Sequence, residues 1–158
     1  MDVNTRGHYV CSHCGTTRIP EGIDRDGVRV LETERSGLAC SRCGALLAHA
    51  MVDEYQVEYC MQCRGILVAR QDFARLVRRR RAWASGEAVT PAPADSAELR
   101  PTIACPKCHT RMGTDWYYGP GNVVLNRCGA CDLVWLDDGE LKQIVDAPGA
   151  DRGSRDLS

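Results

Sequence analysis

Two stretches of the chain repeat one pattern of apolar and polar positions. In the later stretch, an apolar run at 133–136 is followed by apolar residues that recur three and four positions apart, as on one face of a helix. The earlier stretch, from 64 to 77, has the same order. The helix positions are Leu141, Ile144 and Val145 in the later stretch and Phe73, Leu76 and Val77 in the earlier one. Each stretch therefore predicts a short amphipathic helix.

Turn chemistry marks the start of the later helix and the segment before it. Asp137, with Glu140 three residues later, has the spacing of a capping box, whereas Ala69 replaces Asp137 in the earlier stretch and predicts a weaker cap. Further upstream, strand-forming residues flank Gly, Pro, Gly and Asn at 119–122, which predicts a β-hairpin. Each unit is therefore expected to contain a hairpin followed by a helix.

Cysteine spacing indicates what holds such small units together. The chain has 10 cysteines, and all of them fall in C-x-x-C pairs, which is the spacing of metal-binding knuckles. The chain starts without an apolar leader and has no run long enough to span a membrane, so we expect a cytoplasmic protein without membrane contact whose thiols stay reduced. This favours metal over disulfides. A redox C-x-x-C would need a βαβ context, which the sequence lacks.

The repeat assigns eight of the cysteines to two sites. Residues 40–77 and 105–145 are two copies of one unit, and the 14 residues after the second knuckle of each copy align without a gap. Two knuckles close one tetrahedral site, and four thiolates leave no open position for a catalytic water. The predicted ligands are Cys40, Cys43, Cys60 and Cys63 at one site and Cys105, Cys108, Cys128 and Cys131 at the other. Zinc is the expected ion, although four thiolates also suit a rubredoxin-like iron, which colour would distinguish.

The residues around the last knuckle resemble a known family. The segment CDLVWLDDGEL at 131–141 is close to G-V-W-L-D-x-G-E-L, which runs on from the second knuckle in zinc ribbons of the transcription factor IIB type. The segment CRGILVARQDF at 63–73 is a degenerate version, so the resemblance covers both copies. It implies two tandem zinc ribbons with eight cysteine ligands and two zinc ions, and work related to transcription or nucleic acids.

Together these features predict a small, metal-stabilised α+β fold. A single phenylalanine leaves little material for a continuous core, so zinc supplies part of the stability. Each ribbon is expected to combine a β-hairpin with a short helix, and a segment rich in Ala, Pro and Ser joins the ribbons as a flexible linker. The expected segments are an N-terminal segment with an extra knuckle (1–39), the first ribbon with its basic helix (40–84), the linker (85–100), the second ribbon (101–147) and a disordered tail (148–158).

One cysteine pair has no counterpart in the repeat. Cys11 and Cys14 could hold a third zinc together with His8, or share an ion with a protein partner or a second chain. Alternatively, they pair with Cys40 and Cys43, although the repeat argues against that arrangement. The sequence thus predicts two zinc ions, or three if the N-terminal pair completes a site.

Charge is segregated along the chain, although the formal net charge is only −1. Residues 64–82 contain seven Arg and one Asp, whereas 101–146 contain four basic and six acidic residues. The first helix is expected to end next to Trp83 on a run of four arginines, namely Arg78, Arg79, Arg80 and Arg81. At 100° per residue, Arg80 continues the apolar stripe of that helix. The run could grip the phosphates of DNA or RNA, or be a solvated helix end, where arginine is favoured.

Two hypotheses for the function follow. In the favoured one, the chain is a structural zinc-binding protein that docks onto nucleic acid or the transcription machinery, such as RNA polymerase, through the basic helix. In the alternative, it is a protein-interaction adapter or metal-dependent assembly factor without nucleic-acid binding. We expect no enzymatic activity, because the sequence has no Ser/His/Asp set, no carboxylate pair with a pocket and no phosphate-cradling glycine loop.

Overall fold

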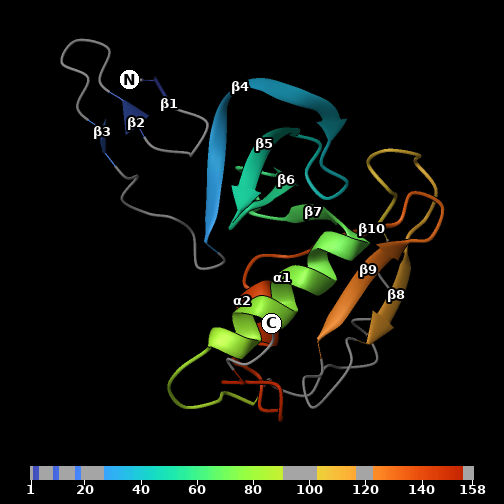
Figure 1. Ribbon diagram of the computed structural model, residues 1–158. Coiled ribbons are helices and arrows are strands. Elements are labelled where there is room, and N and C mark those ends of the chain that lie inside the picture. Colours follow the sequence, from blue (N-terminus) through green and yellow to red (C-terminus); the bar gives the residue numbers. More distant parts are fainter. Residues whose placement is uncertain are drawn as a thin grey trace.

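A seven-stranded antiparallel sheet forms the centre of the protein (Figure 1). The computed structural model describes residues 2–3, 9–10, 17–18, 27–90, 103–116 and 123–154. In spatial order, the strands are β4 (Val28–Ala39), β5 (Leu46–Val52), β6 (Tyr55–Tyr59), β7 (Ile66–Ala69), β10 (Leu133–Leu136), β9 (Val124–Cys128) and β8 (Gly113–Trp116). The helices are α1 (Arg70–Trp83) and α2 (Glu140–Asp146). A separate three-stranded sheet consists of β1 (Asp2–Val3), β2 (Tyr9–Val10) and β3 (Thr17–Arg18).

Both ribbons contain the predicted hairpin and helix, and each has between them a strand that was not predicted, β7 or β10. In the first ribbon, the β5–β6 hairpin is followed by β7 and α1, and in the second, the β8–β9 hairpin is followed by β10 and α2. The predicted helix positions face the core: Phe73, Leu76, Val77, Leu141 and Ile144 are buried, and Val145 is partly buried. The first ribbon has a further strand that the second lacks, because β4 begins in the N-terminal segment and pairs with β5.

The two ribbons join edge to edge within one sheet. β7 and β10, the strands after the second knuckle of each copy, pair antiparallel with Leu67 opposite Trp135. Equivalent residues of the two copies differ by 68 in number, as Cys60 and Cys128 do, so Leu67 and Trp135 are equivalent and lie on a pseudo-twofold axis. The sequence left the relative orientation of the ribbons open, and the expected flexible linker between them is not shown: the two ribbons share one sheet.

The reason for this junction is that β7 is apolar on both of its faces. Ile66 and Val68 belong to the core beneath the helices, whereas Leu67 belongs to the core on the opposite side. A strand of this kind is stable when both faces are covered and both edges are paired. β10 has the same character, with Val134 in one core and Trp135 in the other. Pairing β7 with β10 removes an apolar open edge from each ribbon.

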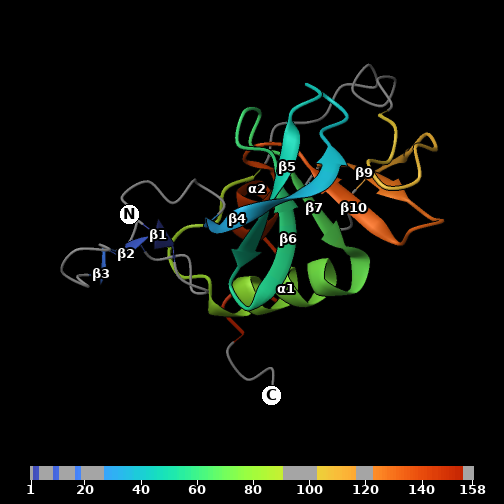
Figure 2. The same cartoon turned by 90° about the horizontal axis from the view of Figure 1, so that it is seen from above.

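The two faces of the joined sheet have different coverings. α1 and α2 contact each other and pack against one face, where they enclose an apolar core with residues from both ribbons (Figures 1 and 2). The opposite face holds a second core, which contains buried cysteines of both ribbons together with Trp135. The helices therefore shield one face, and the cysteines gather on the other.

The two helices begin differently. The Glu140 carboxylate accepts a hydrogen bond of 2.7 Å from the amide of Asp137, which is one half of the predicted capping box. The Asp137 carboxylate does not complete the box, because it binds Trp135 and Arg42 instead. α1 begins after Ala69 without a side-chain cap, as predicted. Within the described residues, neither helix is long and apolar enough to cross a membrane.

Part of the predicted linker and tail is folded onto the helices. The amide of Val89 donates a hydrogen bond of 2.8 Å to the carbonyl of Asp146, which ties the start of the linker to α2. The amide of Gly153 donates one of 2.8 Å to the carbonyl of Arg81 at the end of α1. These contacts differ from the expected flexible linker and disordered tail. Outside the described residues lie 91–100, 155–158 and the proposed third site of His8, Cys11 and Cys14.

Two candidate four-cysteine metal centres

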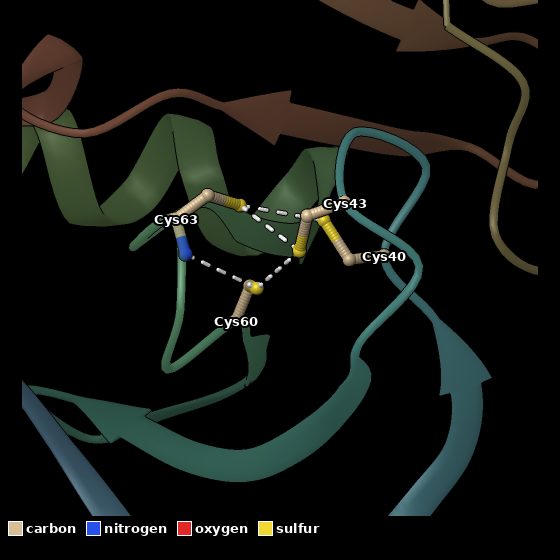
Figure 3. A group of neighbouring side chains, drawn as sticks. All are labelled: Cys40, Cys43, Cys60 and Cys63. Atoms are coloured by element: carbon tan, nitrogen blue, oxygen red, sulfur yellow. Dashed lines mark hydrogen bonds between the residues drawn. The ribbon is translucent and has the colours of Figure 1, made fainter.

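The four cysteines of the first ribbon converge on one point (Figure 3). Cys40 follows β4 and Cys60 follows β6, so the sheet places the two knuckles opposite each other. The Sγ atoms of Cys40 and Cys63 are 3.4 Å apart, and those of Cys43 and Cys60 are 3.5 Å apart. All four Sγ atoms lie within 4.8 Å of one another. The predicted first ligand set is therefore brought together.

The spacing of these sulfur atoms suits a tetrahedral zinc ion. Zinc–sulfur bonds of about 2.3 Å would hold the sulfurs about 3.8 Å apart. Three of the separations here are 3.4, 3.5 and 4.0 Å, and all are within 4.8 Å. A disulfide would need sulfurs only about 2 Å apart. The amides of Arg42 and Cys63 lie 3.4 Å from the sulfurs of Cys40 and Cys60, as in structural zinc sites, where such bonds stabilise the thiolates.

The second ribbon has a quartet of the same kind. Its ligand atoms also lie within 4.8 Å of one another, and the Sγ atoms of Cys108 and Cys128 are 3.6 Å apart. The amide of Cys131 lies 3.4 Å from the sulfur of Cys128, like its counterpart in the first ribbon. Two closed quartets fit two zinc ions, as predicted. In each, four protein ligands fill the tetrahedron, which is the arrangement of structural zinc sites.

The thiols of each quartet differ in acidity. Burial opposes ionisation of Cys60, but hydrogen bonds from the amide of Cys63 and its neighbours lower its pKa to about 7. Hydrogen bonds from Thr110 lower the pKa of Cys108 to about 6. Burial, and then the contact with Cys60, raise the pKa of Cys63, while the contact with Cys108 raises the pKa of Cys131 to about 12. One thiolate thus hinders the next, and a bound dication would relieve this repulsion.

The four knuckles of the two quartets share one backbone turn. The residue after the second cysteine has a left-handed conformation with φ between 56° and 76°. In three knuckles, its amide donates a hydrogen bond of 2.8 Å to the carbonyl of the first cysteine. The four residues are Gly44, Arg64, His109 and Asp132. Because only one of them is glycine, this turn could not be predicted from glycine positions.

One apolar cluster connects the two centres. Trp135 is fully buried, and its indole N–H donates a hydrogen bond of 3.0 Å to the Asp137 carboxylate. Arg42, from the first knuckle, donates two hydrogen bonds to the same carboxylate, at 2.5 and 2.8 Å. Ser41 beside it donates to the carbonyl of Ala104. The cluster contains Cys40, Leu47, Cys60, Leu67, Ile103, Cys105, Met112, Cys128 and Trp135. Each centre therefore packs against the ribbon that holds the other.

A glycine makes room for this tryptophan. A Cβ atom at Gly65 would lie 2.1 Å from the ring of Trp135, so only glycine lets the ring lie against β7. The equivalent position in the second ribbon is Leu133. Sequence reasoning missed this contact, as well as the role of Asp137 in holding Trp135. The sequence signal for this contact was that Trp135 lies in one copy of the repeat and Gly65 in the other.

Arg81, one of the four predicted nucleic-acid contacts, lies inside the protein. It is only 6% exposed, and its guanidinium donates hydrogen bonds of 2.6 and 2.8 Å to the carbonyls of Ile144 and Ala147. Two further bonds, of 2.8 and 2.7 Å, reach the carboxylate of Asp151 and lower the pKa of that group. Arg81 therefore fastens α1 to the end of α2 and is not available to a phosphate.

The other arginines of the run differ in exposure. Arg80 is bound at 3.0 and 3.1 Å to the carboxylate of Asp53 in the β5–β6 turn. Arg79 pairs with Glu54 at 2.6 Å, but both side chains are more than half exposed. Arg78 is exposed on the surface of α1. The structure thus divides the run into two arginines with structural contacts and two at the surface.

The first ribbon is similar to a known family of zinc fingers. Residues 39–79, which contain the first quartet, match the model of a family described as transcription factor zinc-finger. This part of the chain is therefore similar to a zinc ribbon of that family. The second quartet, within 105–131, is consistent with a second copy of this zinc finger.

Similarity to curated proteins is limited to a short segment. Metastasis-associated protein MTA2 of Homo sapiens and that of Mus musculus are each 33% identical over 61 residues, which cover 38% of this chain and 9% of the relative. The chain therefore spans only a small part of the relatives that it matches. No solved structure matches the chain. These findings support a zinc-binding module but do not identify its partner.

Proposed function

We propose that this zinc-binding protein is a non-enzymatic, cytoplasmic binding module of transcription, which docks onto nucleic acid or RNA polymerase through the outer face of α1. We define this face by Arg75, Arg78 and Arg79. The match to the transcription factor zinc-finger family supports a role in transcription. The closed quartets support a structural metal, because a catalytic zinc keeps one position open for water or substrate.

The exposed arginines of α1 carry the proposal. Arg75 and Arg78 are exposed and make no ion pair with the described residues. Arg79 pairs with Glu54, but exposed pairs of this kind contribute only about 0–1 kcal/mol, so a phosphate or an acidic side chain can compete for the guanidinium. The three arginines lie three and four positions apart on a helix that is anchored to the sheet. They therefore present positive charge at fixed spacing.

Salt-dependent binding tests the nucleic-acid form of this proposal. Zinc-loaded protein would be titrated with labelled duplex and single-stranded oligonucleotides over a series of salt concentrations. Each phosphate contact that is lost should reduce the slope of log affinity against log salt by about 0.7–0.9. Arg75→Ala and Arg78→Ala should each do so, whereas Arg111→Ala, an exposed arginine of the second ribbon, should not. Equal slopes for all variants would refute the role of this face.

The polymerase form needs its own assay. Purified RNA polymerase would be immobilised, and capture of the wild type would be compared with that of Arg75→Ala and Arg111→Ala. Weaker capture of the first variant alone supports docking through α1. If neither oligonucleotides nor polymerase bind the wild type, the transcription proposal is wrong.

One observation favours the adapter alternative. Arg80 and Arg81 are bound to acids of the same chain, so the surface of α1 is less positive than the sequence run suggests. Under this alternative, the ribbons form a rigid platform for a protein partner, and neither DNA nor RNA binds at any salt concentration. Capture of a protein by the wild type that Arg75→Ala and Arg78→Ala retain in full would favour the adapter.

A further inference from the structure

A surface hollow lies beside the end of α1. It encloses about 380 Å³ between the β5–β6 turn and the last turns of the helix. Its lining consists of Asp53, Glu54, Arg79, Arg80 and Trp83. The indole of Trp83 is 63% exposed, although the other tryptophan whose side chain is described, Trp135, is fully buried. The β5–β6 turn is at the far end of the hairpin from the cysteines, so the hollow is separate from the metal centres.

The charged groups of the hollow are matched in sign. Arg80 binds the Asp53 carboxylate through two nitrogens, Arg79 binds Glu54, and Arg29 donates a hydrogen bond of 2.6 Å to the carbonyl of Asp53. A bare cation or anion would meet both signs of charge here. A flat, uncharged ring with donors and acceptors on its edge fits better, because guanidinium and carboxylate groups can each bind such an edge.

A line of positive charge leads to the hollow. Arg75, Arg79 and Trp83 are spaced four residues apart and therefore lie on one stripe of α1, which spans about 12 Å. Arg78 is exposed next to this stripe. Arginines that follow a backbone and an aromatic side chain that stacks on a base are the two components of single-strand binding sites.

We propose that the hollow takes one base of a single-stranded nucleic acid, stacked on the Trp83 indole, while neighbouring phosphates contact Arg75, Arg78 and Arg79. This inference rests on the proposed function and names the class of nucleic acid. A single strand is required because the bases of a duplex are stacked on one another and present no free face to an indole. The carboxylate of Asp53 is held by Arg80, which contacts no phosphate in this arrangement, so it offers acceptors to the base edge without an unbalanced negative charge.

Substitution of Trp83 in the zinc-loaded full-length chain tests the stacking. Binding would be followed by the fluorescence anisotropy of labelled single-stranded DNA and RNA of mixed sequence and of a duplex of equal length. Trp83→Ala should weaken single-strand binding about 5- to 150-fold, which corresponds to the loss of one stacked base. The salt slope should stay unchanged, because no phosphate contact is removed. Trp83→Phe should restore most of the affinity.

Val89→Ala is the matched control, because Val89 is 60% exposed and lies outside the hollow. Native mass spectrometry would verify two zinc ions in every variant. If Trp83→Ala binds single strands like the wild type, or if the duplex binds more tightly than the single strand, the inference is wrong and the proposed function stands. If no oligonucleotide binds, the inference is also wrong, and the polymerase assay decides the proposed function separately.

Discussion

The first and second ribbons bind metal alike but have different parts in the fold. The first has the additional strand β4 and a helix of 14 residues, whereas the helix of the second has 7. The second ribbon supplies Trp135, and the first supplies Gly65, which makes room for the ring, and Leu67 opposite it. Two copies of Trp135 could not both occupy the pseudo-twofold axis. The degenerate sequence of the first ribbon is therefore complementary to the second, rather than a weaker form of it.

The difference between the ribbons indicates that the second depends on the first for its stability more than the first depends on the second. Its short helix has two buried residues, and Leu136, Leu141 and Ile144 reach a core to which α1 contributes Phe73, Leu76 and Val77. α1 would keep β5, β6 and β7 beneath it without the second ribbon. The core of the second ribbon thus depends on α1 of the first ribbon. Substitutions in the two ribbons should therefore have unequal effects on stability.

Loss of a zinc ligand should have the largest effect, and an asymmetric one. Structural zinc contributes about 10–16 kcal/mol of binding free energy, as much as the whole stability of a small domain. Cys60→Ser should therefore unfold the first ribbon and release zinc from both centres. Cys128→Ser should empty the second centre and leave one zinc at the first, held less tightly because the core around Trp135 is lost.

Native mass spectrometry with a chelator series would count the ions in each variant. Gln62→Ala is the control, since Gln62 is exposed in a knuckle without being a ligand, and it should keep both ions. Retention of the second zinc in Cys60→Ser would contradict the dependence of the second ribbon on the first.

Gly65→Ala should give the next largest effect. The new methyl group would overlap the ring of Trp135, and overpacking of a core costs about 1–3 kcal/mol or more. Chemical denaturation would measure the loss. Gly129→Ala is the control, because a Cβ there meets no atom within 4 Å. A double variant with Trp135→Leu should recover part of the loss, and strictly additive effects would show that the two side chains do not conflict.

Asp137→Ala should destabilise the protein less than Gly65→Ala does, but more than Arg42→Ala does. It leaves the buried indole N–H of Trp135 without an acceptor, at about 1–3 kcal/mol. Arg42→Ala removes only a partly exposed ion pair, which contributes about 0–1 kcal/mol. Thermal denaturation of both variants would rank them. An Arg42→Ala variant as unstable as Asp137→Ala would place the stabilisation in the ion pair instead of the indole.

Local features of the molecule were predictable from the sequence. The eight ligands follow from C-x-x-C spacing and the repeat, and both helix faces follow from residues three and four positions apart, since these patterns depend on neighbours in the chain. The junction of β7 with β10 was not predictable, because a continuous apolar run shows that a strand is buried without showing which strand covers its edge.

The arginine run shows the same limit at the level of single residues. Helical periodicity predicted that Arg80 would continue the apolar stripe of α1, and Arg80 is indeed partly covered. It did not predict that Arg81 would be the buried one, because its partners are carbonyls at the end of α2 and a carboxylate in the tail. Both lie more than 60 residues away along the chain, and local periodicity carries no information about them.

The smallest effects are expected at the left-handed residues of the knuckles, and they should differ in sign between positions. Arg64→Gly should stabilise the first ribbon by about 0.5–1 kcal/mol. The substitution removes the cost of about 1–2 kcal/mol that a left-handed conformation has for a residue with a Cβ. The greater loss of backbone entropy when glycine folds offsets part of this gain. Asp132→Gly should do the same in the second ribbon. Gly44→Ala should destabilise by a similar amount, although a Cβ there meets no atom. Thermal denaturation with two zinc ions bound would compare the three. Equal shifts at Arg64 and Asp132 would show that the knuckles are equivalent as turns and that the difference between the ribbons lies in the core around Trp135.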